Sequence, residues 1–209
     1  MCLPMGQAVT RQYERSAASE DGAADGPDQD AALLRNACAG DEGAWRLLVD
    51  RYARRVFALA RSRCGDAEVA EEVTQHVFVK AAEHLTGGGY EERGRFESWL
   101  FRIAMNRIRD EVRRRTRRAT HEGDGALLTL SGGDEEERPD ASTLLRLRSA
   151  LARLGDADRE VIELRHHAGL EFKQIASLLE EPLGTVLARH HRALRKLRGW
   201  MDEQDGGAT

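Results

Sequence analysis

Arginine and lysine side chains concentrate in two short stretches of this 209-residue chain. Residues 101–118 hold eight arginines and two acids, a net charge of +6, whereas residues 185–199 hold five cations and no acid. Guanidinium groups clamp phosphate oxygens, and they can bind a guanine edge through two hydrogen bonds. A run of cations can also simply solvate a helix face, so the elements that carry the two stretches must decide between these interpretations.

The second cationic stretch lies in a helix-turn-helix pattern. Apolar spacing predicts helices over residues 158–167 and 171–179, followed by a short turn over residues 180–184. Thr185 is placed to cap a last helix over residues 186–197. In such a motif the last helix presents its N-terminal residues to the major groove of DNA. We therefore expect DNA contacts from its outward-facing polar residues, which are Arg189, His190, Arg192, Arg195 and Lys196.

The first cationic stretch lies at the end of a block of predicted helices. Residues 30–39, 42–64, 66–85 and 96–117 each carry apolar residues at helical spacing, and Asp66 is a suitable N-cap for the third segment. No segment alternates polar and apolar residues with period two, so we expect no sheet. The predicted fold class is all-α.

Composition divides the chain into two small helical domains and less ordered connections. Residues 1–29 are rich in Ala, Gly, Ser and Asp and predict a disordered tail. The helical domains are expected over residues 30–118 and 141–201, and residues 202–209 form a second tail. Between the domains, the Gly-rich stretch 119–140 holds seven acids and one arginine, which indicates a flexible acidic linker.

The cysteine count and the hydropathy pattern argue against several classes of protein. Cys2, Cys38 and Cys64 are odd in number and form no Cys-x-x-Cys pair, which indicates neither a disulfide framework nor a zinc site and fits a reducing cytoplasm. No run of about 18 apolar residues could span a membrane, so we expect no membrane insertion. The N-terminus shows no signal pattern.

Four histidines of the predicted C-terminal domain are candidates for catalysis or metal binding. His166 and His167 are adjacent, as are His190 and His191, and adjacent side chains point about 100° apart on a helix. Each pair is therefore poorly placed to share one metal ion. The chain also has no HExxH motif and no Gly-rich phosphate loop. We expect no enzyme activity, no cofactor and no metal.

Four stretches carry sequence patterns in a fixed order. They are DAEVAEEVTQHVF (residues 66–78), RFESWLFRIAMN (95–106), REVIELR (159–165) and GTVLARHHRA (184–193). Together they resemble the extracytoplasmic-function (ECF) sigma factors of bacterial RNA polymerase, over residues 30–198. The resemblance implies a protein that binds core RNA polymerase and directs promoter recognition, DNA opening and transcription initiation. The implied partners are core RNA polymerase, through its largest-subunit clamp and its flap, and promoter DNA, with an anti-sigma factor as a further candidate.

The resemblance implies a polymerase-docking face on the helix over residues 66–85. In the family this helix grips the clamp of the largest subunit, and the matching positions here are Glu71, Glu72, Gln75 and His76. Acids and an amide suit such a contact if the partner face is basic. His76 stands where the family usually has an acid, which makes this contact titratable near neutral pH.

The resemblance implies that residues in and just before the helix over 96–117 bind the minus-ten promoter element. Unstacking a base costs a few kcal/mol, and stacking it on an aromatic ring returns about 1–3 kcal/mol. Tyr90 supplies such a ring, and Asn106 can both donate and accept, as reading a base edge requires. Arg109 and Arg113 follow one and two turns later and are placed to hold phosphates.

In the C-terminal domain, the resemblance implies contacts to the minus-thirty-five element. The matching residues are Thr185, Arg189, His190, Arg192 and Lys196. The family usually has a basic residue and a serine after its Thr-Val pair, where this chain has Leu187 and Ala188. We therefore expect an atypical upstream element or a weaker dependence on it.

Three other functions remain open from the sequence. A stand-alone helix-turn-helix regulator explains the C-terminal half equally well, but it leaves Tyr90, Asn106 and the arginine-rich helix unexplained. Whether the protein binds promoter DNA alone or only with core polymerase would separate the two. A helical enzyme lacks a recognisable motif, and a protein-only adaptor leaves the two cationic stretches without a role.

Overall fold

The computed structural model describes residues 27–87, 96–122 and 141–205. Within these ranges the chain forms eight helices and no strand, which confirms the all-α fold class. It divides into two compact units, residues 1–130 and 131–209. Tyr90, most of the predicted linker and most of the predicted N-terminal tail lie outside the described residues.

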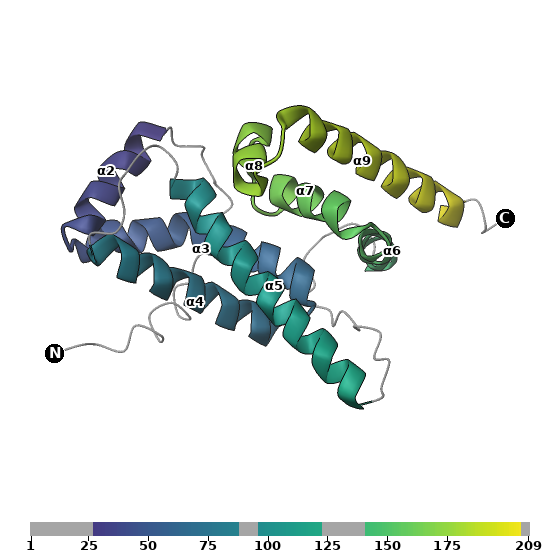
Figure 1. The fold of residues 1–209 in the computed structure, drawn as a ribbon, viewed down its shortest axis with the longest axis horizontal. Coiled ribbons are helices and arrows are strands. Elements are labelled where there is room, and N and C mark those ends of the chain that lie inside the picture. The colour runs from purple at the N-terminus through teal and green to yellow at the C-terminus, as the bar shows by residue number, and fades with distance from the viewer. Residues whose placement is uncertain (1–26, 88–95, 123–140, 206–209) are drawn as a thin grey trace. The chain divides into compact units, whose positions relative to one another are not determined.

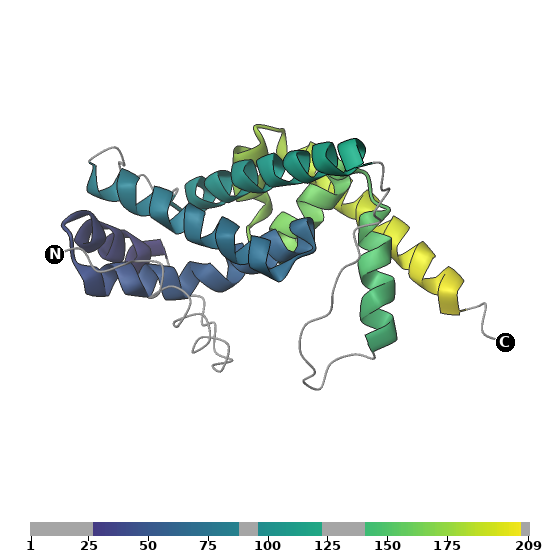
Figure 2. The same ribbon diagram turned by 90° about the horizontal axis from the view of Figure 1, so that it is seen from below.

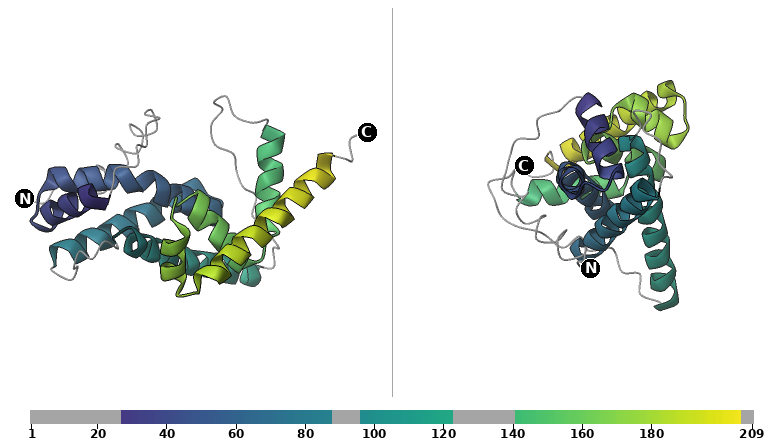
Figure 3. Two further views of the ribbon diagram at one scale, coloured as in Figure 1. Left: turned by 90° about the horizontal axis from the view of Figure 1, so that it is seen from above. Right: turned by 90° about the vertical axis from the view of Figure 1, so that its left-hand side faces the viewer.

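The N-terminal unit is built around the long helix α3 (Glu42–Cys64). This helix packs against α2 (Pro27–Cys38), α4 (Ala67–Thr86) and α5 (Phe96–Glu122), as Figure 1 shows. Figure 3 shows the short α2 beside the beginning of α3. The bounds of α3 agree with the prediction, whereas α2 begins three residues earlier and α5 ends five residues later than predicted.

Local side-chain chemistry sets the turns that make these helices antiparallel. Asp41 caps α3, because its Oδ1 accepts from the N–H groups of Gly43 and Ala44 at 2.7 and 3.1 Å. Gly65 ends the same helix at φ 73°, a conformation that glycine adopts without strain. Asp66 then caps α4 by accepting from the N–H of Val69 at 3.2 Å, as the sequence predicted.

Apolar side chains from α3, α4 and α5 form one core in this unit. Tyr52 packs edge-on against Phe96, with ring centroids 5.5 Å apart, and joins α3 to the beginning of α5. Burying such aromatic and aliphatic groups supplies most of the driving force for folding. The fully buried members of this core include Leu48, Val56, Leu59, Val73, Val77, Leu100, Phe101, Met105 and Ile108.

The C-terminal unit is organised on the long helix α9 (Leu183–Asp205). This helix packs against α6 (Ala141–Ala152), α7 (Asp156–His166) and α8 (Phe172–Leu179), and Figure 2 shows α6 beside it. One buried cluster of this unit is Ala150, Leu154, Ile162, Ala193 and Leu197, with Leu151, Trp200 and Met201 packed against it.

The turn between α8 and α9 is tighter than the sequence predicted. Glu180 takes the left-handed conformation at φ 57° and ends α8, and α9 begins at Leu183. The carbonyl oxygen of Pro182 accepts from the N–H groups of Thr185 and Val186 at 2.9 and 3.2 Å. Thr185 therefore lies inside the first turn of α9, and its prediction as the N-cap of that helix was wrong.

Candidate polymerase and promoter interfaces

A buried carboxylate organises part of the arginine-rich helix α5. Glu111 is 1% exposed and its Oε1 accepts from Nη2 of Arg114 at 2.9 Å, and Arg107 and Arg115 lie 3.7 and 3.4 Å from its oxygens. Burial raises the pKa of Glu111, but the hydrogen bond from Arg114 and the three positive charges outweigh it, so the pKa lies below its usual range. Arg107, Arg114 and Arg115 therefore stabilise the folded unit even when no partner is bound.

Arg115 also connects α5 to the turn between α3 and α4. Its Nη1 donates to the carbonyl oxygen of Cys64 at 2.9 Å, and its Nη2 lies 3.3 Å from Oδ2 of Asp66. A hydrogen bond from the N–H of Val69, with smaller help from Arg115, lowers the pKa of Asp66. The start of α4 is thus held to α5, and this fixes the predicted docking face relative to the arginine helix.

We expect replacement of Glu111 with Ala to lower the free energy of unfolding of the N-terminal unit by about 2 kcal/mol. Removing one partner of a fully buried ion pair lowers the stability by more than this. Here the loss is smaller, because Arg114 and Arg115 are partly exposed and can be hydrated when Glu111 is absent. Urea unfolding can be followed by Trp45 and Trp99 fluorescence in a Trp200→Phe chain. The matched control is Asp110→Ala, an exposed neighbour, and equal losses in the two variants would contradict a structural role for Glu111.

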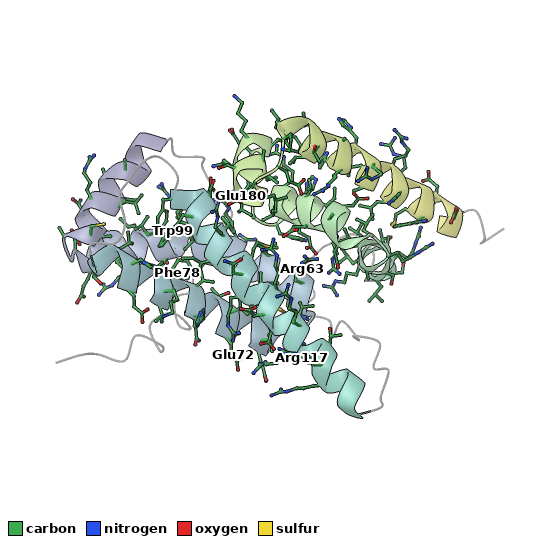
Figure 4. The ribbon with its side chains drawn as sticks, in the orientation of Figure 1. Arg63, Glu72, Phe78, Trp99, Arg117 and Glu180 are labelled. Atoms are coloured by element: carbon green, nitrogen blue, oxygen red, sulfur yellow. The ribbon has the colours of Figure 1, made fainter. Side chains whose placement is uncertain are left out.

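The predicted minus-ten residues on α5 share one face of the helix, on which Asn106 and Arg113 are exposed and Arg109 is half-buried. Asn106 is exposed, and its Oδ1 accepts from Nη1 of Arg109 at 3.2 Å. Arg113 follows two turns after Asn106 and is also exposed. Residues spaced by three, four or seven positions share a helix face, so a strand of DNA could meet all three side chains. Exposed arginines continue along the helix at residues 117 and 118, and Figure 4 labels Arg117 near its end.

The predicted docking residues lie on the solvent side of α4. Glu71, Glu72 and His76 are exposed, and Gln75 is half-buried. Partial desolvation of this exposed ring, followed by the charges of Arg107 and Lys80, lowers the pKa of His76, so its imidazole takes up a proton less readily than an ordinary histidine. The hydrogen bond to Glu111 is the main cause that raises the pKa of Arg114, and the charge of Glu72 adds to it. Glu72, which Figure 4 labels on α4, is therefore near enough to Arg114 of α5 for its charge to act on it.

The helix-turn-helix of the C-terminal unit contains another buried carboxylate, at Asp158, whose burial the sequence did not predict. Asp158 on α7 is 5% exposed and accepts from Nε and Nη2 of Arg192 and from Nζ of Lys196, with shortest distances of 2.6 and 3.0 Å. These bonds, led by that from Arg192, lower the pKa of Asp158 to about 2. Arg192 and Lys196 thus hold α9 against α7, while their side chains remain 52% and 42% exposed.

Two more of the predicted minus-thirty-five residues have partners within the unit. Arg189 donates from Nη1 to Glu181 at 2.7 Å, which ties α9 to the turn whose Glu180 is labelled in Figure 4. His190 is half-buried, and its ring lies against Phe172 of α8 with centroids 4.9 Å apart. Thr185 is half-buried in the first turn of α9. Arg195, also predicted to face outward, is exposed.

The pattern of charges could have revealed the burial of Glu111 and Asp158. Glu111 follows Ala104 and Ile108 at helical spacing, and Asp158 precedes Val161 and Ile162 by three and four residues. An acid on an apolar stripe is buried only when cations pair with it. The sequence supplies these cations in both places, at residues 114–115 and 192–196.

No helix in the described part of the chain is long and apolar enough to cross a membrane.

Both units match models of a known protein family. The model of Sigma-70 region 2 matches residues 48–118, and that of Sigma-70 region 4 matches residues 150–199. The ECF RNA polymerase sigma factor SigL of Mycobacterium tuberculosis is 34% identical over 176 residues, which are 82% of this chain and 97% of that protein.

Solved structures agree with this assignment. CnrH, solved in complex with the cytosolic domain of CnrY, is 28% identical with a TM-score of 0.63, over 83% of this chain and 97% of that chain. The sigma factor RpoE of Bartonella quintana, solved with the anti-sigma factor NepR, shares the fold at 21% identity with a TM-score of 0.65, over 75% of this chain and 96% of that chain. The chain therefore carries a region 2 unit followed by a region 4 helix-turn-helix, and SigL matches it across both units. It belongs to the ECF sigma factors, which direct RNA polymerase to initiate transcription at promoters.

Proposed function

We propose that this sigma factor docks on the clamp of core RNA polymerase through α4 and holds promoter DNA with α5 and α9. The observation that carries the proposal is that one unit presents both exposed acids on α4 and a row of exposed arginines on α5. A basic clamp surface would be attracted by the acids, and the DNA phosphates by the arginines. The chain acts as a binding protein and not as an enzyme, and it works in the cytoplasm with the polymerase.

The docking contact is assigned to Glu71, Glu72, Gln75 and His76. The two glutamates and the histidine are exposed and available to a partner. His76 takes up a proton less readily than an ordinary histidine and adds little positive charge against a basic partner, so the replacement of the family's acid at this position weakens the attraction without reversing it.

The minus-ten contact is assigned to Asn106, Arg109 and Arg113 on α5, with Tyr90 as the stacking ring. The intrahelical hydrogen bond from Arg109 to Asn106 orients the amide, so that less side-chain freedom is lost when a base binds. Tyr90 lies outside the described residues, and its role rests on its aromatic ring alone.

The minus-thirty-five contact is assigned mainly to Arg192 and Lys196, and also to Thr185, Arg189 and His190. Asp158 binds Nε and Nη2 of Arg192, which leaves the Nη1 donors for a phosphate or a base edge. An arginine held by a buried carboxylate keeps its remaining donors in a fixed direction, and this favours a specific contact. Leu187 is half-buried and Ala188 has no polar group, so neither supplies the readout found elsewhere in the family.

An anti-sigma factor is a further proposed partner. RpoE of Bartonella quintana is solved in complex with the anti-sigma factor NepR. A protein that covers the α4 face or the α9 face of this chain would prevent it from joining the polymerase and the promoter at the same time. A stand-alone regulator is the weaker proposal, because it gives no role to the region 2 unit over residues 48–118.

Replacing Asn106 with Ala should impair promoter opening more than initial promoter binding. The variant removes the amide that would read a flipped base, while Arg113 continues to hold the backbone. We expect open-complex formation, measured by permanganate footprinting of unpaired thymines, to fall about tenfold or more, which corresponds to one good hydrogen-bonded contact. The closed complex measured by gel shift at low temperature should change less than threefold.

The matched control for this experiment is Ser98→Ala, which removes a polar group at the other end of α5. Equal losses of binding and opening in the Asn106 variant would make Asn106 a structural residue. Normal opening would remove it from the minus-ten site.

A further inference from the structure

The turn before α9 supplies an acid that holds one of the predicted DNA-binding arginines. Both carboxylate oxygens of Glu181 contact the same nitrogen of Arg189, Nη1, at 2.7 and 2.6 Å. The side chains of Arg189 and Glu181 are 22% and 27% exposed, and Oε2 of Glu181 is buried. Water and dissolved ions therefore reach this pair less easily than they reach an ordinary surface ion pair.

The backbone of the turn determines where this carboxylate lies. The N–H of Glu181 donates to the carbonyl oxygen of Ala176 at 3.0 Å, so the residue is tied to the end of α8. The next residue is Pro182, whose ring restricts φ and whose carbonyl oxygen accepts from the first turn of α9. Because the chain is held on both sides of Glu181, its carboxylate starts from a fixed position and reaches Arg189 in the second turn of α9.

Arg189 belongs to a row of cations on α9 that acids from other elements hold. Arg192 and Lys196 follow it at spacings of three and four residues, so the three side chains share one face of the helix. Asp158 of α7 binds both Arg192 and Lys196, whose side chains are 52% and 42% exposed. Arg189 is 22% exposed. The first two cations can thus meet a phosphate while they stay paired, whereas Arg189 is less accessible to one.

The geometry of the pair affects the two kinds of DNA contact differently. A phosphate is bound mainly through charge, and the carboxylate of Glu181 both neutralises Arg189 and repels an approaching phosphate. A base edge needs directed donors instead, and Nε and Nη2 of Arg189 can supply them, because Glu181 contacts Nη1. The pair therefore weakens the contact that every DNA sequence offers and preserves the contact that depends on sequence.

We propose that Glu181 is a specificity-determining residue of the minus-thirty-five contact: it keeps Arg189 away from DNA phosphates and leaves this arginine to read a base edge. The inference rests on the proposed function, because it requires α9 to meet promoter DNA. Specificity is a difference between two affinities, so weaker binding of unrelated DNA raises it as effectively as tighter binding of the promoter.

The test compares holoenzymes assembled with the full chain or with its Glu181→Gln variant. Fluorescence anisotropy measures their affinities for a promoter duplex from a mapped start site and for an unrelated duplex of equal length, over a series of KCl concentrations. Glutamine keeps the shape of the side chain but not its charge, and a hydrogen bond without that charge is about half as strong. A phosphate then competes successfully for Arg189.

We expect the variant to bind the unrelated duplex about fivefold more tightly, and its log affinity to fall more steeply with log salt by about 0.9, the slope of one additional phosphate. Its affinity for the promoter should change less than about twofold, so the preference for the promoter falls. Adding Arg189→Gln to Glu181→Gln should return the salt slope to that of the parent chain, because no guanidinium is then released.

The matched control is Glu180→Gln, which removes the same charge from the exposed neighbour in the same turn and should leave both the salt slope and the preference unchanged. Far-UV circular dichroism checks that the variants keep their helices. If Glu181→Gln does not fold, Arg189→Gln in the parent chain decides. It should lower the affinity for the promoter without changing the salt slope, and a slope shallower by about 0.9 would show a phosphate contact and overturn the inference.

Failure of this inference differs from failure of the proposed function. A parent holoenzyme that prefers its promoter, with a Glu181→Gln variant of equal salt slope and equal preference, would overturn the role of Glu181 alone and leave it as an anchor of the turn. An equal change in Glu180→Gln would do the same, because the effect would then come from net charge. A parent holoenzyme without any preference for the promoter would overturn both.

Discussion

Replacing Glu72 with Lys and Gln75 with Ala should abolish the binding of core RNA polymerase. Glu72 is exposed and Gln75 is half-buried on α4, whereas the core contacts of this helix come from residues such as Val73 and Val77, so we expect the variant to keep its helices. A lysine that faces a basic partner replaces an attraction with a repulsion, and like charges at an interface cost several kcal/mol. We therefore expect the dissociation constant to rise more than about 100-fold.

Surface plasmon resonance with immobilised core polymerase measures this change, and far-UV circular dichroism checks that the helices remain. Glu42→Lys is the matched control, because it makes the same charge reversal at an exposed position on another helix, α3. The control should bind within about threefold of the parent chain. Intact association of the double variant would move the docking face away from α4.

The second large effect is expected from Asp158→Asn. The pKa of Asp158, about 2, lies below its usual value of 3.8, so the carboxylate stabilises the folded unit by roughly 2 kcal/mol at pH 7. A depressed pKa contributes stability that is present above about pH 4 and is lost as the pH falls towards 2. The difference in unfolding free energy between the parent chain and the variant should therefore shrink over this acid range.

Urea unfolding reports this difference through Trp200 fluorescence in the chain without Trp45 and Trp99, because Arg153 stacks on Trp200 at 4.4 Å in the folded unit. The matched control is Asp156→Asn, which removes an exposed acid from the same first turn of α7 and should cost less than about 0.5 kcal/mol. A loss in Asp158→Asn that does not depend on pH would mean that packing, and not the ion pair, holds α7 to α9.

The same variant should weaken the contact with the minus-thirty-five element. Without the carboxylate, Arg192 and Lys196 keep their charges but lose the group that orients them. Phosphate attraction is then retained and directional contacts are lost. We expect the preference of the holoenzyme for its promoter over unrelated DNA to fall more than its affinity for DNA in general.

Local patterns predicted much of this fold because local physics determines it. The bounds of α3, its end at Gly65 and the cap at Asp66 depend on residues within one turn of each other. The start of α9 was missed, because the left-handed conformation of Glu180 is unusual for a residue with a side chain, and the sequence gave no reason to expect it.

The roles of individual cations could not be predicted to the same extent. The charge pattern of the sequence identifies both basic stretches. Which of these cations stabilise the fold depends on ion pairs between segments that are distant in the sequence. Arg115 donates to Cys64, 51 residues away, and Arg192 donates to Asp158, 34 residues away. The contact of His166 with His190 likewise spans 24 residues and appears only when α7 and α9 have packed.

The central claim is that this chain selects promoters only as part of RNA polymerase. Its most direct test is in vitro transcription with purified core enzyme and a genomic DNA library, with start sites mapped by sequencing of the transcripts. The account predicts a defined set of new start sites that requires both the polymerase and this chain, and that disappears with Glu72→Lys and Gln75→Ala. An unchanged set of start sites on addition of the chain would contradict it.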